Sequence, residues 1–531
     1  MGTAILQLCD YRYLPYEVEF ARREIQTVVG HVPQRTARGF EVALNGTSVD
    51  ALRRLTYVKQ VLLPSGECII PDQAALETAT PNPRRGLTRQ STRYSAHCLH
   101  EYRGRFNPQV VRAIANMLSV DETTWILDPF CGSGTTLLEC AHAGWNAVGL
   151  DLNPLAIIIA NAKLAAYRAD PKSLGDAVER LTQSLNEATR GLHYDSEFPW
   201  ASIIALSRHP DEWPVPNLAY LNRWFSESAL AQFVAILRSI DREVTPELRD
   251  VFRVLLSDIV RDASHQEPAD LRIRRRLRPL LNYPVVPTFL KSAHEKISAV
   301  IAARSAVGRV RGQQQAYVFD NREPLVGIPF IQDGNTRPAI AITSPPYATA
   351  LPYVDTQRLS LCLLGLIDAD CINQLDRSLT GARDITESPR SLLEQQIESG
   401  RAGSVSPAVG RLCERLLSLA RGEGNGFRRR NVPSVILRYF EGMGAMFENV
   451  GQTFEDGGRF ALVVGRNSTT LGGERVTIET PSLLADVAAH RGWQLEAMLE
   501  LDAYPRYDLH SRNSITTECL VVLSRSSHAA D

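Results

Sequence analysis

The spacing of hydrophobic residues predicts alternating helices and strands between residues 107 and 154. Apolar positions in NPQVVRAIANMLSV recur every three to four residues, which is the period of an amphipathic helix, whereas WILDPF is a short apolar run typical of a buried strand. GTTLLECAHAG then predicts a helix that ends at Gly144, and NAVGLDLNP predicts another strand. This βαβ order is typical of a parallel sheet with crossover helices.

The alternation stops near residue 165 and resumes near residue 313. Long helical patterns such as SALAQFVAILRSI and KSAHEKISAVIAARSAV dominate the block between. Later strands are predicted at QAYVFD, PAIAITS, GGRFALVVG, WQLEAMLEL and TECLVVLSR, with a helix at SLLADVAAHRG. We expect the last two strands to form an antiparallel hairpin at the sheet edge. The predicted fold class is α/β, with a mostly parallel, Rossmann-like sheet that carries an antiparallel edge strand.

The remaining segments complete the predicted organisation. Near the N-terminus, YEVEF and FEVAL predict strands and VDALRRLTYVKQVLL shows helical periodicity, which indicates a small α+β unit. Pro, Thr, Asn and Arg then dominate a stretch with the composition of a linker. The expected parts are an N-terminal α+β domain at 1–70, a linker at 71–93, the α/β domain in three parts at 94–164, 313–367 and 432–531, a helical insertion at 165–312 and a flexible insertion at 368–431.

Composition narrows the class of protein. The chain has 531 residues, of which 44% are hydrophobic, as is ordinary for a globular protein of two or three domains. No run of about 18 apolar residues predicts a membrane span, and the N-terminus lacks the regions of a secretory signal, so we expect a cytoplasmic protein without a membrane partner. Nine cysteines without a CxxC pair argue against a disulfide framework or a zinc site, so we expect no metal.

A basic segment contrasts with the overall net charge of −1. Residues 251–312 carry 12 Arg or Lys against 5 Asp or Glu, with LRIRRRLRP at the centre. Such a segment can contact nucleic-acid phosphates, although a solvated helical face has a similar composition. The candidate nucleic-acid contacts are Arg272, Arg274, Arg275, Arg276 and Arg278.

The segment ILDPFCGSGTTLLE places glycines where a predicted strand turns into a helix. Gly132 and Gly134 let a ligand approach the backbone, and the helix N-terminus leaves amide groups free. No Gly-Lys-Ser/Thr follows, which excludes a P-loop, and Leu137 stands where a dinucleotide motif has its third glycine. The next strand ends at Asp151, whose carboxylate can accept hydrogen bonds from a ribose or cap the following helix. A nucleoside cofactor without a pyrophosphate fits this pattern.

The stretch ITSPPY, from Ile342 to Tyr347, ends another apolar strand abruptly. Proline cannot donate to a sheet ladder, so Pro345 and Pro346 stop the strand and hold its backbone rigid. Ser344 and Tyr347 are therefore presented at a fixed strand end.

DPFCGSGTT, followed by GLDLNP and later by TSPPY, resembles the S-adenosylmethionine-dependent DNA amino-methyltransferases, which act on cytosine N4 or adenine N6. The resemblance covers about 94–165, 315–365 and, more loosely, 434–525. It implies a class I methyltransferase sheet, S-adenosyl-L-methionine as the cofactor and double-stranded DNA as the substrate. It also leaves room for restriction or phage-defence proteins as partners.

Carried over position by position, the resemblance implies a set of cofactor contacts. Asp151 would hold the ribose, and Asp320 is the candidate contact for the adenine, with Gln332-Asp333-Gly334 as the competing segment. The rest of the set comprises Phe106, Asn107 and Pro108 at the amino-acid end, Asp128, Phe130, Cys131, Gly132 and Gly134 around the methionine, and Asn153 beside the ribose contact.

The resemblance also implies catalytic roles for the strand end. In the family, the serine hydroxyl and the first proline carbonyl accept hydrogen bonds from the exocyclic amine, which here means Ser344 and Pro345. Pro346 would keep that carbonyl rigid, and Tyr347 would stack on a base that has left the duplex. Serine at the first position leans towards cytosine N4, so we expect N4 methylation, with adenine N6 as the alternative.

Two other functions stay open at this point. YEVEFARREIQ and GFEVALNGTSVDALRRLTYVKQVLL resemble the N-terminal part of tRNA guanine-N2 methyltransferases, whose related motif is Asp-Pro-Pro-Tyr. The serine of TSPPY counts against that function. A non-catalytic scaffold that binds the cofactor or nucleic acid is the third class, and the intact Asp128, Gly132 and Gly134 count against it.

Overall fold

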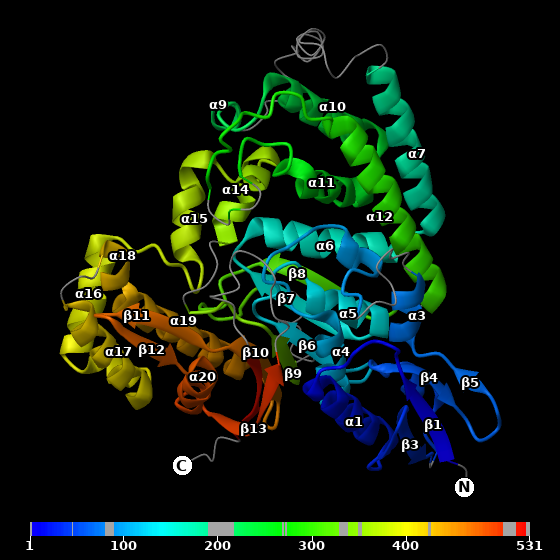
Figure 1. Cartoon of the computed structure of the whole chain (residues 1–531), viewed down its shortest axis with the longest axis horizontal. Coiled ribbons are helices and arrows are strands. Elements are labelled where there is room, and N and C mark those ends of the chain that lie inside the picture. The colour runs from blue at the N-terminus through cyan, green and yellow to red at the C-terminus, as the bar shows by residue number, and fades with distance from the viewer. Residues whose placement is uncertain are drawn as a thin grey trace.

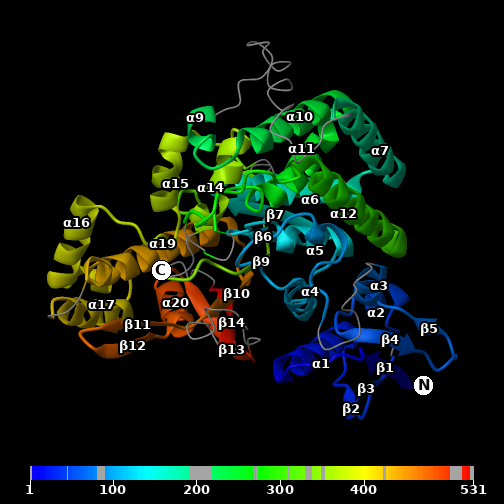
Figure 2. The same cartoon turned by 45° about the horizontal axis from the view of Figure 1, so that its top comes forward.

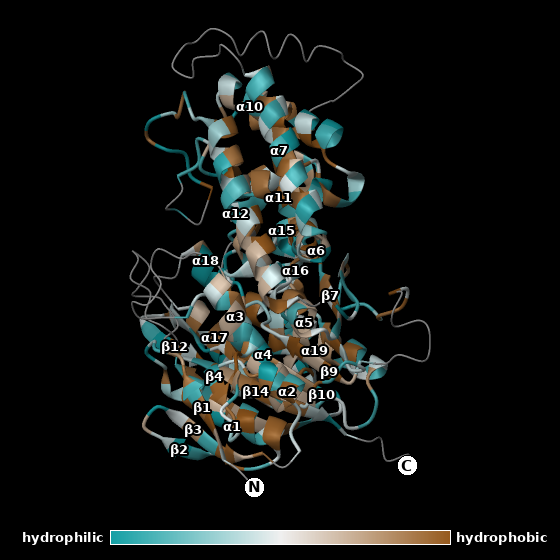
Figure 3. Ribbon diagram, turned by 90° about the vertical axis from the view of Figure 1, so that its right-hand side faces the viewer, coloured by the Kyte–Doolittle hydropathy of each residue, from teal (hydrophilic) through white to brown (hydrophobic). Residues whose placement is uncertain are grey.

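A computed structural model of the chain shows a seven-stranded central sheet, a smaller sheet below it and a helical unit above it (Figures 1 and 3). Helices cover both faces of the central sheet. The structure describes residues 3–44, 46–79, 90–189, 217–267, 270, 273–308, 310–328, 338–348, 353–422, 426–502 and 517–526.

The central strands follow the order β13-β14-β10-β9-β6-β7-β8. β14 pairs antiparallel with both neighbours, and the remaining pairs are parallel. The expected Rossmann-like methyltransferase sheet and its final hairpin are confirmed; the antiparallel strand lies one place inside the edge, because β13 occupies the edge itself. The strands are β6 (Trp125–Asp128), β7 (Asn146–Asp151), β8 (Gln314–Val318), β9 (Ile340–Thr343), β10 (Arg459–Gly465), β13 (Trp493–Asp502) and β14 (Thr517–Arg525).

Side chains of the central strands alternate between two cores. Ile126 of β6 packs on the face that holds α4, α5 and α6, whereas Leu127 packs on the opposite face with α19 and α20. Ile342 and Ala341 of β9 divide in the same way. A period of two with both faces apolar is what a parallel sheet between helices requires. The helices are α4 (Pro108–Met117), α5 (Thr135–Ala143), α6 (Pro154–Arg168), α19 (Val432–Thr453) and α20 (Thr480–Ala489).

An antiparallel sheet of order β2-β3-β1-β4-β5 forms the N-terminal end. The prediction of a strand at YEVEF is wrong, because this segment lies in helix α1. Pro15 begins the helix, and Phe20, Ile25 and Val29 repeat at helical spacing along its buried face. The elements are β1 (Thr3–Leu8), α1 (Pro15–Val29), β2 (Gln34–Thr36), β3 (Gly39–Ala43), α2 (Val49–Arg53), β4 (Val58–Leu62) and β5 (Cys68–Ile69).

The helical unit lies between β7 and β8 in the chain and stands above the central sheet (Figure 3). Residues Asp72–Ala79, expected at the start of a linker, instead form α3, because Leu76 is buried against Ala303 and Val307 of α12. Among the described helices, none has both the length and the hydropathy needed to cross a membrane. The unit comprises α7 (Pro171–Ala188), α9 (Leu218–Leu221), α10 (Glu227–Glu243), α11 (Pro246–Val260) and α12 (Val285–Val307), joined by the later α14 (Tyr353–Leu363).

The segment expected as a flexible insertion, 368–431, contains several helices. Leu393, Ile397 and Leu416 of this segment are buried in the same core as α19. Figure 2 shows this group and a nearby hairpin on one side of the central sheet, with the N-terminal sheet on the other. The elements are α15 (Ile372–Ser378), α16 (Glu387–Glu398), α17 (Pro407–Ala420), α18 (Phe427–Arg430), β11 (Asn467–Leu471) and β12 (Glu474–Ile478).

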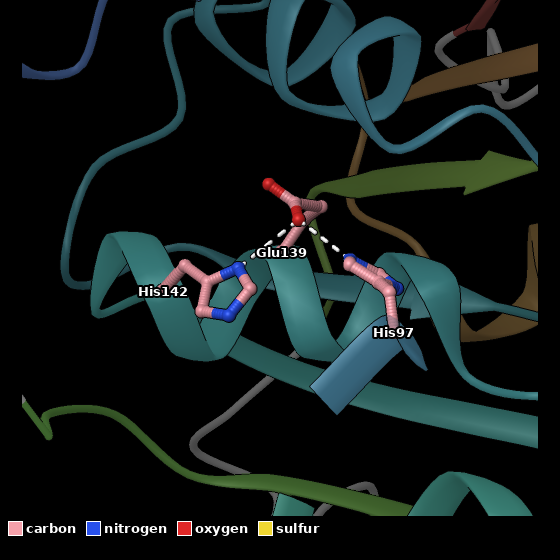
Figure 4. Close-up of side chains that lie close together, drawn as sticks. All are labelled: His97, Glu139 and His142. Carbon is pink, nitrogen blue, oxygen red and sulfur yellow. Dashed lines mark hydrogen bonds and ion pairs between the residues drawn. The ribbon is translucent and has the colours of Figure 1, made fainter. Parts of the chain in front are cut away.

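A buried polar cluster surrounds Glu139 on α5 (Figure 4). His97 Nε2 and His142 Nδ1 lie 2.8 and 3.0 Å from Glu139 Oε1. Tyr94 donates its hydroxyl hydrogen to the same oxygen at 2.8 Å, and Arg112 Nε donates to Oε2 at 2.9 Å. Burial alone would raise the pKa of Glu139, but Arg112 and the imidazoles outweigh it and hold that pKa well below its usual range. Burial lowers the pKa of His97 to about 3 and also lowers that of His142.

The cluster predicts a loss of stability in mild acid. Below pH 6.5 the unfolded chain takes up protons on these histidines while the folded chain does not, so stability falls as the pH falls. At pH 5 the buried His97 imidazole should lower the free energy of unfolding by about 2 kcal/mol relative to pH 7.5, and His142 should add to this loss. Thermal unfolding of wild type and His97→Gln at both pH values measures this loss, which should be smaller in the variant. His490→Gln, at an exposed position, should keep the wild-type pH dependence.

Candidate active site

A cavity with about 660 Å³ of empty space opens at the carboxyl ends of the central strands. This edge is where open α/β sheets bind ligands. The cavity brings together the segments that follow β6, β7, β8 and β9, which are far apart in the sequence. Its lining residues are Tyr102, Gly104, Phe130, Gly132, Asp151, Leu152, Asn153, Phe319, Asn321, Ser344, Pro346, Leu379 and Thr380.

The glycine loop after β6 forms one wall. Gly132 has a φ of +49°, a left-handed conformation that favours glycine, and a Cβ added there would lie 3.5 Å from the Tyr102 ring, an ordinary van der Waals contact. Gly134 has a φ of +73° and lies so close to Ala160 of α6 that a Cβ would clash at 2.6 Å. Lys163, fully buried on α6, donates to the Ser133 carbonyl at 2.8 Å and fixes the loop from behind.

Asp151 stands at the end of β7 and lines the cavity. Its carboxylate accepts hydrogen bonds from the backbone N–H of Gly132 at 3.1 Å and of Asn153 at 2.9 Å. Burial raises the pKa of Asp151 to about 6, and these two bonds oppose the rise. The helix-capping role falls instead to Asn153, whose side chain accepts from the Leu155 N–H at 3.0 Å. Because Asn153 caps the helix, the Asp151 carboxylate is not needed for capping and lines the cavity wall.

Asp128 connects the glycine loop to the SPPY strand. Its side chain is buried and accepts the Thr343 hydroxyl hydrogen at 2.6 Å and the Phe130 N–H at 3.1 Å. Burial raises its pKa to about 6. Asp128 faces a second, smaller space of about 300 Å³ that also contains Phe106, Cys131, Ser133 and Ser344.

The SPPY strand end lies at the same cavity as the glycine loop. Ser344 and Pro346 line the cavity, whereas Pro345 is buried. Tyr347 is partly exposed and donates its hydroxyl hydrogen to Glu518 Oε1 on β14 at 2.6 Å. Gly381 backs this segment so tightly that a Cβ there would lie 2.8 Å from the Tyr347 carbonyl oxygen. The segment is thus supported from two sides.

Several predicted cofactor contacts lie away from the cavity. Asn107 caps α4 by accepting from the Gln109 N–H at 2.9 Å, and Pro108 is the first residue of that buried helix. Gly134 serves the packing of α5 on α6 and does not line either space. Among the described residues, these three positions have structural roles. The competing adenine segment, Gln332-Asp333-Gly334, lies outside the described residues.

Asp320 does not line the cavity, whereas its neighbours Phe319 and Asn321 do. The Asp320 carboxylate pairs with the Arg322 guanidinium at 2.6 Å, which explains the lowered pKa of Asp320 although burial alone would raise it. Arg322 in turn donates to the Ser378 carbonyl at 2.9 Å. This chain of contacts holds the turn that carries Leu379 and Thr380 against the cavity.

Sequence reasoning missed Tyr102, Gly104, Leu379 and Thr380. Tyr102 and Gly104 lie in HEYRGRFNP, just before the predicted Phe106, so nearness to that motif was the available signal. Leu379 and Thr380 follow α15, and their segment carries no comparable sequence signal.

The arginines of the predicted nucleic-acid segment have different surroundings. Arg276 donates to the carbonyls of Ser264 and Gln266, both at 3.0 Å, so it supports the fold of its own loop. Arg274, Arg275 and Arg278 are exposed, and Arg272 lies outside the described residues.

His97, Glu139 and His142 lie close enough for their ligand atoms to bind one metal ion, within 4.8 Å of one another. However, Tyr94 and Arg112 already donate to both Glu139 oxygens, and the guanidinium charge would repel a cation. The cluster fits a hydrogen-bond network centred on the Glu139 carboxylate better than a metal site.

Known proteins resemble parts of the chain. Residues 82–162 match the family described as DNA methylase. The type II methyltransferase M.MvaI of Kocuria varians is 25% identical over 56% of this chain and 64% of its own length. M.MjaII of Methanocaldococcus jannaschii is 42% identical over 13% of each chain, and M.BsoBI of Geobacillus stearothermophilus is 23% identical over 56% of this chain and 58% of its own. The chain thus spans less than two thirds of these relatives.

Among solved structures, the rRNA methyltransferase aviRa of Streptomyces viridochromogenes covers 80% of this chain and 88% of its own, at 8% identity and a TM-score of 0.27. A score this low carries no argument about fold or function. The sheet order, the glycine loop beside the SPPY strand end, the DNA methylase match and the type II relatives agree with one another. The resemblance of this chain to the S-adenosylmethionine-dependent DNA amino-methyltransferases of the N4/N6 type is confirmed.

Proposed function

We propose that the chain is a DNA methyltransferase that transfers a methyl group from S-adenosylmethionine to the exocyclic amino group of a flipped base, with cytosine N4 as the target. The observation that carries this proposal is the single cavity shared by Gly132, Asp151, Ser344 and Pro346. A methyl donor and an amine acceptor must meet within bonding distance, and this cavity is where the two predicted sets of residues meet.

The cavity has the features that a nucleoside donor needs. The Tyr102 ring and the Gly132 backbone line the cavity side by side, with the ring about one van der Waals contact from the glycine. Asp151 offers a carboxylate for ribose hydroxyls, and Phe319 offers an aromatic face beside it for the adenine. Ser133 Oγ is buried at the smaller space without a hydrogen-bond partner among the described residues, so it can bind a polar group at the amino-acid end.

The SPPY strand end would activate the amine. An exocyclic amino group is a poor nucleophile because its lone pair is delocalised into the ring. Ser344 Oγ and the Pro345 carbonyl would accept hydrogen bonds from its two N–H groups, draw them out of the ring plane and stabilise the positive charge that develops on nitrogen. When bound, S-adenosylmethionine supplies an electrophilic methyl group. The rigid backbone at Pro345 and Pro346 holds the two acceptors in place before the reaction, so no conformational entropy is lost in positioning them during it.

The target base is the finer part of the proposal. Neither the DNA methylase match nor the relatives distinguish cytosine N4 from adenine N6. Serine at the first motif position, Ser344, favours cytosine by its resemblance to N4 enzymes. Double-stranded DNA is the proposed substrate, with Arg274 and Arg278 contacting phosphates. A restriction or defence protein is the proposed partner class, by analogy with the type II relatives.

Methyl transfer from radiolabelled S-adenosylmethionine to duplex DNA, with bulk tRNA as the competing substrate, tests the function. We expect label in DNA, recovered as N4-methylcytosine after digestion to nucleosides and mass spectrometry. N6-methyladenine in its place would overturn the base assignment alone. Label in tRNA only would reject the DNA function, and cofactor binding without transfer to either would favour a scaffold.

The Asp151 carboxylate predicts pH-dependent cofactor affinity. With a pKa of about 6, Asp151 loses its charge as the pH falls through 6 and becomes a weaker acceptor for the ribose hydroxyls. Calorimetry with S-adenosylhomocysteine should show affinity falling between pH 8 and pH 5. Asp151→Asn should bind about 10-fold more weakly at pH 8 and lose most of the pH dependence. The exposed Asp370→Asn should behave as wild type, and normal affinity of Asp151→Asn would remove the ribose assignment.

Replacing Tyr347 should separate base binding from cofactor binding. Loss of the ring in Tyr347→Ala should lower kcat/KM for DNA by about 10- to 100-fold, because one base–aromatic stack contributes about 1–3 kcal/mol. The affinity for S-adenosylhomocysteine should change little. Tyr347→Phe keeps the ring and loses only the bond to Glu518, so its defect should be smaller. Equal activity of Tyr347→Ala and wild type would exclude stacking by this ring.

A further inference from the structure

The loop between α11 and α12 exposes a large apolar side chain among arginines. Leu277 is 95% exposed, the highest value among the large apolar side chains in the described part of the chain. Its neighbours Arg274, Arg275 and Arg278 are exposed as well. An isolated exposed leucine is ordinary on a protein surface, but a nearly fully exposed one inside a basic loop is not explained by packing.

The loop is held in this form by its own contacts. Arg276 N–H donates to the His265 carbonyl at 2.8 Å, and the Arg276 guanidinium donates to the Asp262 carbonyl at 2.8 Å, in addition to its bonds to Ser264 and Gln266. The Arg275 guanidinium lies over the Trp224 ring, 5.3 Å from its centroid. Because these two arginines point inward or along the surface, the Leu277 side chain between Arg276 and Arg278 projects outward.

The charges beside Leu277 are available to an anionic partner. Arg274 has an ion pair with Asp270 at 4.0 Å, the outer limit for such a pair, with its own side chain 68% exposed. Arg278 has no hydrogen bond or ion pair to any residue that the structure describes. Surface pairs of this kind contribute little, so these guanidiniums can turn to phosphates at low cost.

The loop is connected to the cavity through α14, whose Gln357 accepts a hydrogen bond from the cavity residue Asn153 at 2.5 Å. Gln266, which pairs with Arg275 at the base of the loop, donates through Nε2 to the Asp355 carbonyl at 3.4 Å. Asp355 lies in the first turn of α14, the first described helix after Ser344–Tyr347 in the chain. Ser360 of the same helix donates its hydroxyl hydrogen to the Ser257 carbonyl of α11 at 3.3 Å. These two contacts connect Gln266, at the base of the loop, and α11, which precedes the loop, to α14.

We propose that Leu277 is a wedge that enters the base stack of double-stranded DNA beside the target base, while Arg274 and Arg278 bind the flanking phosphates. This rests on the proposed function. A base that rotates out of the duplex leaves its neighbours without a stacking partner, and an apolar side chain can fill that space and oppose the return of the base. The arginine charges bind the DNA phosphates at any sequence. The Leu277 side chain enters the duplex only where a base has left the base stack.

The wedge is tested with Leu277→Ala on two 20-base-pair duplexes, one with a matched target base and one in which the target base is mismatched. A mismatched base leaves the stack more easily and needs the wedge less. We expect kcat/KM on the matched duplex to fall about 10-fold and on the mismatched duplex to stay within about 2-fold of wild type. Leu392→Ala, at an exposed position on α16, is the matched control and should equal wild type on both.

The outcomes separate the wedge from the proposed function. If wild-type protein methylates no DNA, the proposed function fails. If wild type is active and Leu277→Ala is equally active on both duplexes, or loses activity equally on both, only the wedge is rejected. Thermal unfolding should show no change in Leu277→Ala, because the side chain makes few contacts to lose.

Arg274→Gln and Arg278→Gln test the phosphate contacts independently. Each should weaken binding to duplexes of any sequence and reduce the slope of log affinity against log salt concentration by about 0.9. An unchanged slope in both variants would place the DNA elsewhere. Binding that weakens for a protein partner but not for DNA would identify the loop as a protein-docking surface and overturn the proposal.

Discussion

The hydrogen bond from Thr343 to Asp128 joins the two halves of the candidate active site. Asp128 ends β6 and begins the glycine loop, and Thr343 ends β9 and immediately precedes Ser344. The two strands are neighbours in the sheet, with Ile126 opposite Ile340. Because both strands run parallel, their carboxyl ends must emerge at the same edge. The buried bond then fixes the distance between the loop and the strand end.

Buried charge tunes this arrangement. Asp128 and Asp151 are both poorly solvated, and burial raises the pKa of each to about 6. Lys163 is buried behind the glycine loop, and burial lowers its pKa. Its ammonium group donates a hydrogen bond to the Ser133 carbonyl and not to the carboxylate of Asp128 or Asp151. The carboxylates are therefore satisfied by backbone N–H groups and hydroxyls, which keeps the cavity wall polar without a competing side-chain cation.

The central sheet could be predicted because each strand is short, apolar and followed by a recognisable turn. The structure brings the glycine loop, Asp151 and the SPPY end to one cavity, because each lies at the end of a predicted strand. YEVEF was misassigned because Val18 and Phe20 fit a strand period as well as a helical one, and only packing of Ile25 and Val29 further along selects the helix.

Other parts of the site depend on contacts that spacing does not encode. From the sequence, Asp320 and Asn321 are equally plausible as cavity residues, because both follow the same strand. The pairing of Asp320 with Arg322 leaves Asn321 as the residue that lines the cavity. Leu379 and Thr380 reach the cavity from a distant segment held by a bond to the Ser378 carbonyl. Contacts such as the one between Arg322 and Ser378 join residues far apart in the sequence, so no local sequence pattern predicts them.

The turn that carries Thr380 has a mechanical meaning. Thr380 touches the cavity, and the next residue, Gly381, rests directly on the Tyr347 backbone with no room for a single extra carbon atom. One short turn therefore forms both a side of the cavity and the support under the backbone of Pro346 and Tyr347. A side chain introduced at Gly381 would therefore displace the Tyr347 backbone and the Thr380 wall of the cavity together.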